Sequence, residues 1–188
     1  LDTLSEYGLL GSGYALTTIH RPENTDDASA LRAILESLVE LQASGTRVLF
    51  PIHPRTRLAV KGANCEALLE QLETTEPMGA REFLSLAAHA SVIVSDSGGV
   101  AEEVSVLKRP LIIVRRSTER AESIDAGFAR LVGPFEVGAA IRDVLSDQKL
   151  LARLANTPSP YGDGRSARRI AELTQNLIFT RSYQHVYA

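Results

Sequence analysis

SVIVSDSGGVAEEVSVL, residues Ser91 to Leu107, decides the fold class of this chain. Its first part, Ser91–Val94, is apolar and β-branched, which is typical of a parallel strand buried on both faces. The residues from Asp96 to Gly99 suit a tight turn, and Val100–Leu107 then places apolar residues at helical spacing. A strand, a glycine turn and a helix make half of a nucleotide-binding βαβ unit.

The glycine turn has two interpretations that this stretch alone leaves open. Glycine lets the backbone approach a phosphate closely, and the free N–H groups at the start of a helix favour an anion. The alternative is a turn that connects a strand to a helix and binds nothing, since many such turns contain glycine.

Composition excludes several classes of function. The chain has 188 residues, 44% of them hydrophobic and 23% charged, and a formal net charge of -3. This size predicts one domain, and the charge argues against a nucleic-acid-binding surface, which is usually strongly basic. No apolar run approaches the roughly 20 residues that span a bilayer. A single cysteine, Cys65, cannot form an internal disulfide, and we expect a structural residue in a reducing cytoplasm.

Strands and helices alternate along the rest of the chain, which predicts a parallel, doubly wound, Rossmann-like α/β sheet. Residues Leu1–Gly13 read as a linker, and His20–Asn24 as a loop, because Pro22 cannot continue a ladder or a helix interior. Glu66–Glu73 is compatible with helix, strand or both in turn. The remaining predicted strands are Tyr14–Ile19, Arg47–Ile52, Pro110–Val114 and Gly127–Val132. Helices are predicted from the capping residues Asn24–Asp27 to Gly45, after Pro54, and over Arg81–Ala90, Glu122–Ala126, Pro134–Leu145, Gln148–Leu154 and Ser166–Phe179.

Four segments together carry a resemblance to a known family. They are TTIHRPEN from Thr17, SDSGGVAEE from Ser95, RRSTERAESIDAGFARLVG from Arg115 and PYGDGRSARRI from Pro160. In order and spacing they resemble the non-hydrolysing UDP-N-acetylglucosamine 2-epimerases, and they differ from the hydrolysing relatives. The resemblance covers residues 14–178 and implies the C-terminal half of a two-domain, glycosyltransferase-B-like fold. On this basis residues 14–180 form a UDP-binding domain, residues 1–13 lead from a missing N-terminal domain, and residues 181–188 are a tail.

The resemblance also implies an activity. The family converts UDP-N-acetylglucosamine to UDP-N-acetylmannosamine by eliminating UDP across C1–C2 and adding it back with C2 inverted, through 2-acetamidoglucal. It needs no metal or redox cofactor. Bacterial members are typically homodimers in the cytoplasm, and some are activated by their own substrate.

The resemblance places His20 in the active site between the two domains, where the imidazole stabilises charge on the departing UDP or shuttles a proton. Without it, a histidine at a strand end is more often structural. Arg21 and Glu23 are expected to contact the substrate or an allosteric second nucleotide, with an ordinary loop ion pair as the alternative. His53 is a candidate for the border of the same sites.

Around the glycine turn, the resemblance assigns Ser97, Gly98 and Gly99 to the diphosphate and Glu103 to the ribose hydroxyls. Arg120 is expected to neutralise the diphosphate or reach the sugar. Asp96 is expected to face away from phosphate and orient the turn, because a carboxylate would repel it. Glu102 is interpreted as solvated helix surface. Arg115 and Arg116 are interpreted as a solvated pair at a strand end, with the same role as Arg120 as the alternative.

The stretch Pro77–Phe83 is expected to form the uridine pocket, with Phe83 as an aromatic wall and the backbone near Met78 reading the base. Met78 stands where some relatives carry glutamine. The alternative for Phe83 is a core residue of an amphipathic helix. His89 and His185 are interpreted as structural or solvated.

The chain supplies no convincing pair of groups for acid and base catalysis at C2. The resemblance places those groups in the missing N-terminal half, so we expect a truncated or separately encoded half that binds UDP and turns over little or nothing alone.

Two other hypotheses stay open. One is another enzyme on this scaffold, such as an epimerase of a diacetamido-uronic acid or the donor domain of a glycosyltransferase. The other is a non-catalytic UDP-binding or dimer-forming module.

Overall fold

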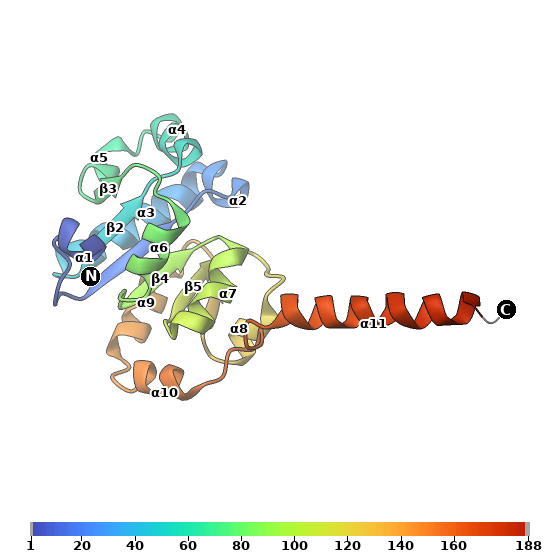
Figure 1. The fold of residues 1–188 in the computed structure, drawn as a ribbon. Coiled ribbons are helices and arrows are strands. Elements are labelled where there is room, and N and C mark those ends of the chain that lie inside the picture. Colours follow the sequence, from blue (N-terminus) through green and yellow to red (C-terminus); the bar gives the residue numbers. More distant parts are fainter. Residues whose placement is uncertain (1, 187–188) are drawn as a thin grey trace.

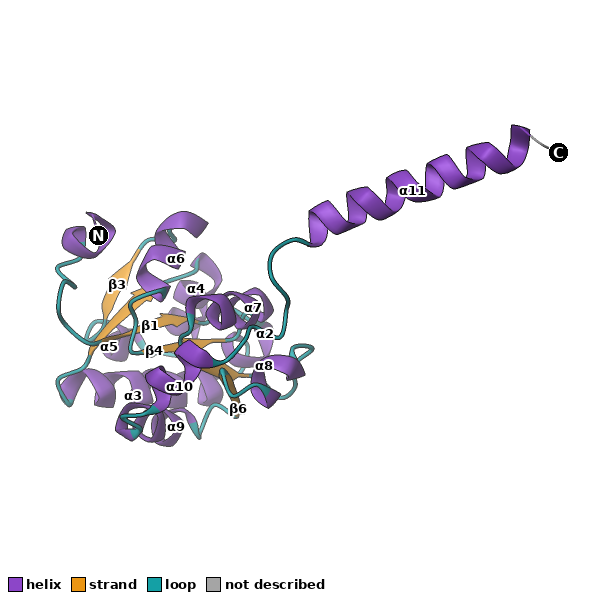
Figure 2. Ribbon diagram, turned by 60° about the horizontal axis from the view of Figure 1, so that its bottom comes forward, coloured by secondary structure: helices purple, strands orange, loops and turns teal. Residues whose placement is uncertain are grey.

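The computed structural model describes residues 2–186, and the side chains of residues 3–178. The chain folds into one sheet of six strands with helices on both sides, and its last helix extends away from the rest (Figures 1 and 2). The strands are β1 Tyr14–Thr18, β2 Arg47–Pro51, β3 Glu73–Thr75, β4 Val92–Ser95, β5 Leu111–Val114 and β6 Ala129–Val132. The helices are α1 Asp2–Glu6, α2 Pro22–Thr25, α3 Ala28–Ala43, α4 Pro54–Gly62, α5 Glu66–Leu69, α6 Ala80–Ala87, α7 Gly98–Leu107, α8 Ala121–Asp125, α9 Val137–Ser146, α10 Leu150–Asn156 and α11 Ser166–Val186.

The strand order fixes where a ligand can enter. The order is β3-β2-β1-β4-β5-β6, and every neighbouring pair is parallel. The chain winds outward from β1 to β3, then returns to pair β4 with the other side of β1. In open parallel sheets the crevice outside the carboxyl ends of the strands, at this reversal, is the usual ligand site. The predicted Rossmann-like fold is confirmed.

Both faces of the sheet are covered by apolar side chains, which explains why its strands read as continuous hydrophobic runs. One face packs against α3, α4, α5 and α9, and includes Leu35, Phe50 and Ile141. The other packs against α1, α6, α7, α8 and α10, and includes Leu16, Leu86 and Val104. With both faces filled, access to the strands is left at their ends.

Two segments differ from the sequence expectations, and a third settles an alternative that was left open. Pro22 does not prevent a helix, because it occupies the first helical position of α2, where a missing N–H costs nothing. Residues 2–13, expected as a linker, contain α1, and Leu4 and Leu9 are buried against the domain. The ambiguous stretch resolves into α5 followed by the edge strand β3.

The C-terminal helix is longer than expected. It begins at Ser166 as predicted but continues to Val186 rather than Phe179, so most of the expected tail is helical. Leu1, the last two residues of that tail and the side chain of His185 lie outside the described part of the chain. No helix within residues 2–186 is long and apolar enough to cross a membrane.

Candidate active site

A crevice of about 330 Å³ opens at the carboxyl edge of the sheet, where β1 and β4 end. Its lining brings together seven of the side chains or turn residues that the sequence singled out. Strand ends contribute His20 and His53. The β3–α6 connection and α6 contribute Met78 and Phe83, while the glycine turn and α7 contribute Ser97, Gly99 and Glu103. Residues distant in the chain therefore meet at the place where the topology predicts a ligand site.

The two histidines face each other because both follow neighbouring strands. Their ring centroids are 5.5 Å apart with an angle of 36° between the planes. His53 is the N-cap of α4, and its Nδ1 accepts the backbone N–H of Arg55 at 3.1 Å. Arg55 also pairs with Asp26 next to α2, at 2.9 Å, so α4 is held beside the loop that carries His20.

The surroundings of His20 favour the neutral form of its imidazole. Burial lowers the pKa of its imidazole below the usual value, and the positive charges of His53, Arg21 and Arg55 act in the same direction. The nearby Asp96 carboxylate opposes them but does not reverse the shift. At neutral pH the ring therefore offers one N–H and one lone pair, as a proton shuttle needs.

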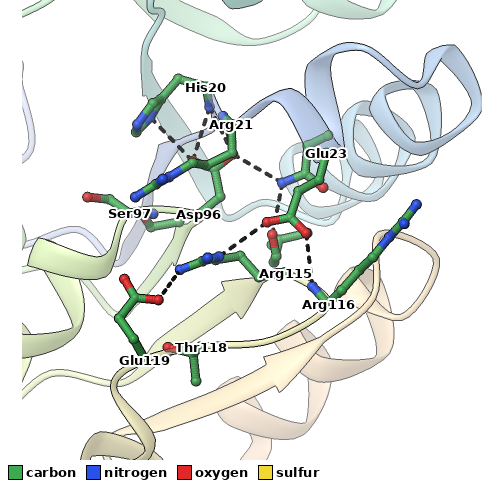
Figure 3. Close-up of polar contacts among 12 residues, drawn as sticks. His20, Arg21, Glu23, Asp96, Ser97, Arg115, Arg116, Thr118 and Glu119 are labelled. Carbon is green, nitrogen blue, oxygen red and sulfur yellow. Dashed lines mark hydrogen bonds and ion pairs between the residues drawn. The ribbon is translucent and has the colours of Figure 1, made fainter.

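Asp96 organises the loop after β1. It is fully buried, and its carboxylate accepts the backbone N–H groups of His20 at 2.9 Å and Arg21 at 2.8 Å (Figure 3). The side-chain amide of Asn24 donates to the same carboxylate at 3.1 Å and to the carbonyl of Val114 at 2.8 Å. As expected, Asp96 points away from the glycine corner and orients the turn. Asn24 plays a part here that its interpretation as a helix-capping residue missed.

The start of α7 presents an anion-favouring corner. Ser97 is its N-cap, yet within the described residues the Ser97 side chain makes no capping hydrogen bond, so the first N–H groups of the helix are left to a ligand or to solvent. Beside it, Arg21 has its Nε buried without a hydrogen-bond partner among the described residues. Figure 3 shows the Arg21 side chain extending toward Ser97. A cationic side chain therefore lies near the N-cap residue of α7.

One carboxylate stands against this corner. A Cβ atom added to Gly98 would lie 2.5 Å from Oε1 of Glu119, so a larger residue at this position would require the Glu119 side chain to move. Arg115 holds that side chain at 2.7 Å, and Arg115 also contacts Glu23 at 3.2 Å (Figure 3). The hydrogen bond from its own backbone N–H and the bond from Arg115 lower the pKa of Glu119.

These contacts correct the sequence interpretations of Arg115 and Glu102. Arg115 is not a solvated residue, since its side chain is 15% exposed and bonded to two carboxylates. Arg116 is exposed, but its backbone N–H also binds Glu23. Glu102 is not merely solvated surface, because it accepts a hydrogen bond from Nε of Arg120. The contacts of Glu23 with Arg115 and Arg116 join segments that are far apart in the sequence, and the strand order brings these segments together.

The remaining predicted residues are placed as follows. Gly98, Arg21, Glu23 and Arg120 lie beside the crevice rather than among its lining residues. Glu103 lines the crevice, and burial, with a smaller effect of Glu102, raises the pKa of its carboxyl group.

Phe83 and Met78 pack against the core and also line the crevice. Within the described residues, no three His, Cys, Asp or Glu side chains are grouped so that they could hold a metal ion.

Comparisons with known proteins agree with this geometry. A family model described as UDP-N-acetylglucosamine 2-epimerase matches residues 2–175. The UDP-N-acetylglucosamine 2-epimerase of Methanocaldococcus jannaschii is 34% identical over 169 residues, which are 88% of this chain and 45% of that protein. The UDP-2,3-diacetamido-2,3-dideoxy-D-glucuronate 2-epimerase of Pseudomonas aeruginosa is 32% identical over 168 residues, again 88% of this chain and 45% of that protein.

A solved structure gives the same answer for the fold. The crystal structure of the M. jannaschii enzyme in complex with UDP-GlcNAc and UDP superposes with a TM-score of 0.79 at 33% identity, covering 93% of this chain and 48% of that one. The present chain thus spans about half the length of the relatives it matches. The resemblance seen in the sequence is confirmed, and the chain belongs to the UDP-N-acetylglucosamine 2-epimerase family.

Proposed function

We propose that this chain is the nucleotide-binding half of a non-hydrolysing UDP-N-acetylglucosamine 2-epimerase, an isomerase. The observation that carries the proposal is the crevice between β1 and β4, where the start of α7 and the histidine pair line one cavity in a chain of this family. The related M. jannaschii structure, which contains UDP-GlcNAc and UDP, supports the choice of ligand.

The reaction that we assign to the complete enzyme is elimination followed by re-addition. A base removes the proton at C2 while the C1–O bond breaks, which gives 2-acetamidoglucal and UDP. The same UDP oxygen then adds back to C1, and a proton is delivered to C2 from the opposite face. No electron acceptor is needed, because the leaving group returns as the nucleophile.

In this proposal the diphosphate lies on Ser97, Gly98 and Gly99, where main-chain N–H groups meet it. Arg120 is the second source of positive charge, and it exchanges its bond to Glu102 for a phosphate oxygen. This corner stabilises the charge that develops on UDP as it leaves, which is the main requirement of the elimination step.

The nucleoside occupies the apolar part of the same crevice. Glu103 binds the ribose hydroxyls, since its two carboxylate oxygens suit a vicinal diol. Phe83 and the backbone near Met78 hold the uracil. His20 stands at the sugar end and either moves a proton or donates a hydrogen bond as the C1–O bond breaks. Arg21, Glu23 and His53 border the substrate or a second, regulatory nucleotide.

The general acid and base are assigned to a second half that this chain does not contain. Helix α11 offers a surface for it, because Ile170, Leu173 and Leu177 follow one another at helical spacing and are 62%, 64% and 66% exposed (Figure 1). We expect the complementary half to cover this stripe and the assembled protein to form a homodimer. We also expect the reaction to take place in the cytoplasm, because a single free cysteine is consistent with a reducing compartment.

A related UDP-sugar is the second candidate substrate. The P. aeruginosa relative is named for a diacetamido-glucuronate. Its sequence identity to this chain, 32%, is close to the 34% of the M. jannaschii N-acetylglucosamine enzyme. A non-catalytic UDP-binding module is the third hypothesis.

Calorimetry and product analysis separate these three functions. We expect the chain alone to bind UDP without turnover. We expect the chain mixed with the N-terminal half of a relative to interconvert UDP-N-acetylglucosamine and UDP-N-acetylmannosamine, with solvent deuterium entering C2 by NMR. Turnover of the diacetamido-uronate only would select the second candidate. UDP binding without turnover in an assembled complex would select the third.

A further inference from the structure

We propose that Asp96 is a positioning residue that, together with the start of α4, holds the two imidazoles of the crevice, His20 and His53, in opposite tautomers. This proposal concerns the state of the rings, and it rests on the proposed function only for what those rings act on.

The environment of His20 fixes the position of its proton. Its Nδ1 lies 3.3 Å from Oδ1 of Asp96, which is fully buried. A carboxylate attracts an N–H group and repels a lone pair, so the ring nitrogen that faces it carries the proton. The neutral imidazole therefore has its proton on Nδ1 and its lone pair on Nε2.

The carboxylate is not free to turn away from the ring. Two backbone N–H groups and the amide of Asn24 bind it, and Asn24 is itself 2% exposed and tied to the carbonyl at the end of β5. The backbone donors belong to His20 and Arg21, so Asp96 fixes the main chain of the histidine as well as its ring. One buried side chain thus sets both the position and the proton of the imidazole.

The environment of His53 places its proton on the other ring nitrogen. Its Nδ1 accepts the N–H of Arg55 in the first turn of α4, at 3.1 Å. A nitrogen that accepts a backbone N–H carries a lone pair, so the neutral ring of His53 has its proton on Nε2. The capping role of the histidine and its tautomer have the same cause.

The crevice therefore contains one imidazole whose Nε2 accepts and one whose Nε2–H donates, with the ring centroids 5.5 Å apart. Such a pair can accept a proton and donate a hydrogen bond at the same time, although neither histidine is protonated. The lone pair can take up a proton, while the N–H can bind an anionic oxygen. Burial lowers the pKa of His20, which keeps this neutral arrangement in place at neutral pH.

The test is long-range ¹H–¹⁵N NMR of the 188-residue chain labelled at histidine, recorded at a pH where both rings are neutral. We expect the Nδ1–H tautomer for His20 and the Nε2–H tautomer for His53. In Asp96→Asn we expect His20 to lose its tautomer preference and its pKa to fall further, while His53 is unchanged. The matched control Asp143→Asn removes a surface carboxylate that pairs with Arg130 and leaves both rings as they were.

An Nε2–H tautomer for His20 in the unmodified chain overturns the proposal, even if Asp96→Asn fails to fold. An unchanged tautomer and pKa of His20 in a folded Asp96→Asn variant overturns it as well. A merely structural role for Asp96 would change stability and leave the tautomer alone. Because no nucleotide is needed, a chain that showed both tautomers and yet failed to bind UDP would refute the proposed function and leave this inference standing.

Discussion

Charged residues around the crevice are paired with one another, and each pair defines what a ligand must exchange. Glu119 lies against Gly98 and is held by Arg115, while Arg120 is held by Glu102. A diphosphate at the glycine corner would repel the Glu119 carboxylate and attract both arginines. We therefore expect a bound phosphate to replace a side-chain carboxylate in these ion pairs.

Glu103 yields a prediction on stability and binding. Burial raises the pKa of its carboxyl group in the folded chain, so the charged form opposes folding above that pKa, and the opposition disappears as the pH falls below the unfolded value. Glu103→Gln should therefore raise the melting temperature at pH 7, by at most about 2 °C because the group is partly exposed.

The gain should vanish at acid pH. UDP affinity at pH 7 should fall at least about tenfold, because glutamine cannot accept hydrogen bonds from both ribose hydroxyls as a carboxylate does. Scanning calorimetry at several pH values and isothermal titration with UDP measure the two effects. Glu122→Gln, on α8, serves as the control. A lower melting temperature at pH 7 together with unchanged UDP affinity would show that Glu103 has neither role.

Among the helices and strands, α7 is the element on which binding depends. Its N-terminus meets the crevice, and Gly98 is where a side chain would collide with Glu119. The contacted atom is the end of a flexible side chain, so a methyl group there can be accommodated, and alanine favours a helix over glycine by about 1 kcal/mol. Instead of destabilising the fold, the substitution should weaken ligand binding.

We therefore expect Gly98→Ala to fold with an unchanged melting temperature and to bind UDP at least about tenfold more weakly, by calorimetry, because the methyl group fills the approach to the helix N–H groups. Gly62→Ala is the matched control, since a Cβ at Gly62 meets nothing within 4 Å. If the two variants bound UDP equally well, the diphosphate would not lie on this corner.

The elements show what local sequence can and cannot predict. The sheet and the glycine turn followed from β-branched runs and helical spacing, because those signals act within a few residues. The pairing of Asn24 with Asp96, 72 residues apart, and of Glu23 with Arg115, 92 residues apart, depends on which strands become neighbours. Sequence spacing carries no information on that order, so the role of Asn24 was missed and Arg115 was interpreted as solvated, although Asp96 was expected to orient the turn.

In the molecule as a whole, α11 is the one long helix that does not pack against the sheet within the part of the chain that the structure describes. It extends away from the sheet (Figure 2). Its apolar residues Ile170, Leu173 and Leu177 are exposed. A continuous exposed apolar stripe marks an interaction surface, and the chain spans about half the length of its relatives. We therefore expect α11 to contact a second half of the protein.

Replacing Ile170 and Leu173 together by serine should abolish reconstitution with the N-terminal half of a relative while leaving UDP affinity within about twofold, because the stripe is remote from the crevice. Gel filtration measures the association, and calorimetry the affinity. The control is Arg168→Ser with Glu172→Ser, which changes an exposed ion pair on the same helix. Full reconstitution by the stripe variant would place the partner elsewhere.

The function proposed for this chain requires a uridine diphosphate to bind where β1 and β4 end. The most direct test is a titration of the ¹⁵N-labelled chain with UDP, followed through the backbone amide signals. We expect saturable shifts centred on Ser97, Gly98 and Gly99 and extending to His20 and Phe83. Shifts confined to the opposite edge of the sheet, near Ser91 and Leu111, or no shift at millimolar UDP, would contradict this placement of the nucleotide.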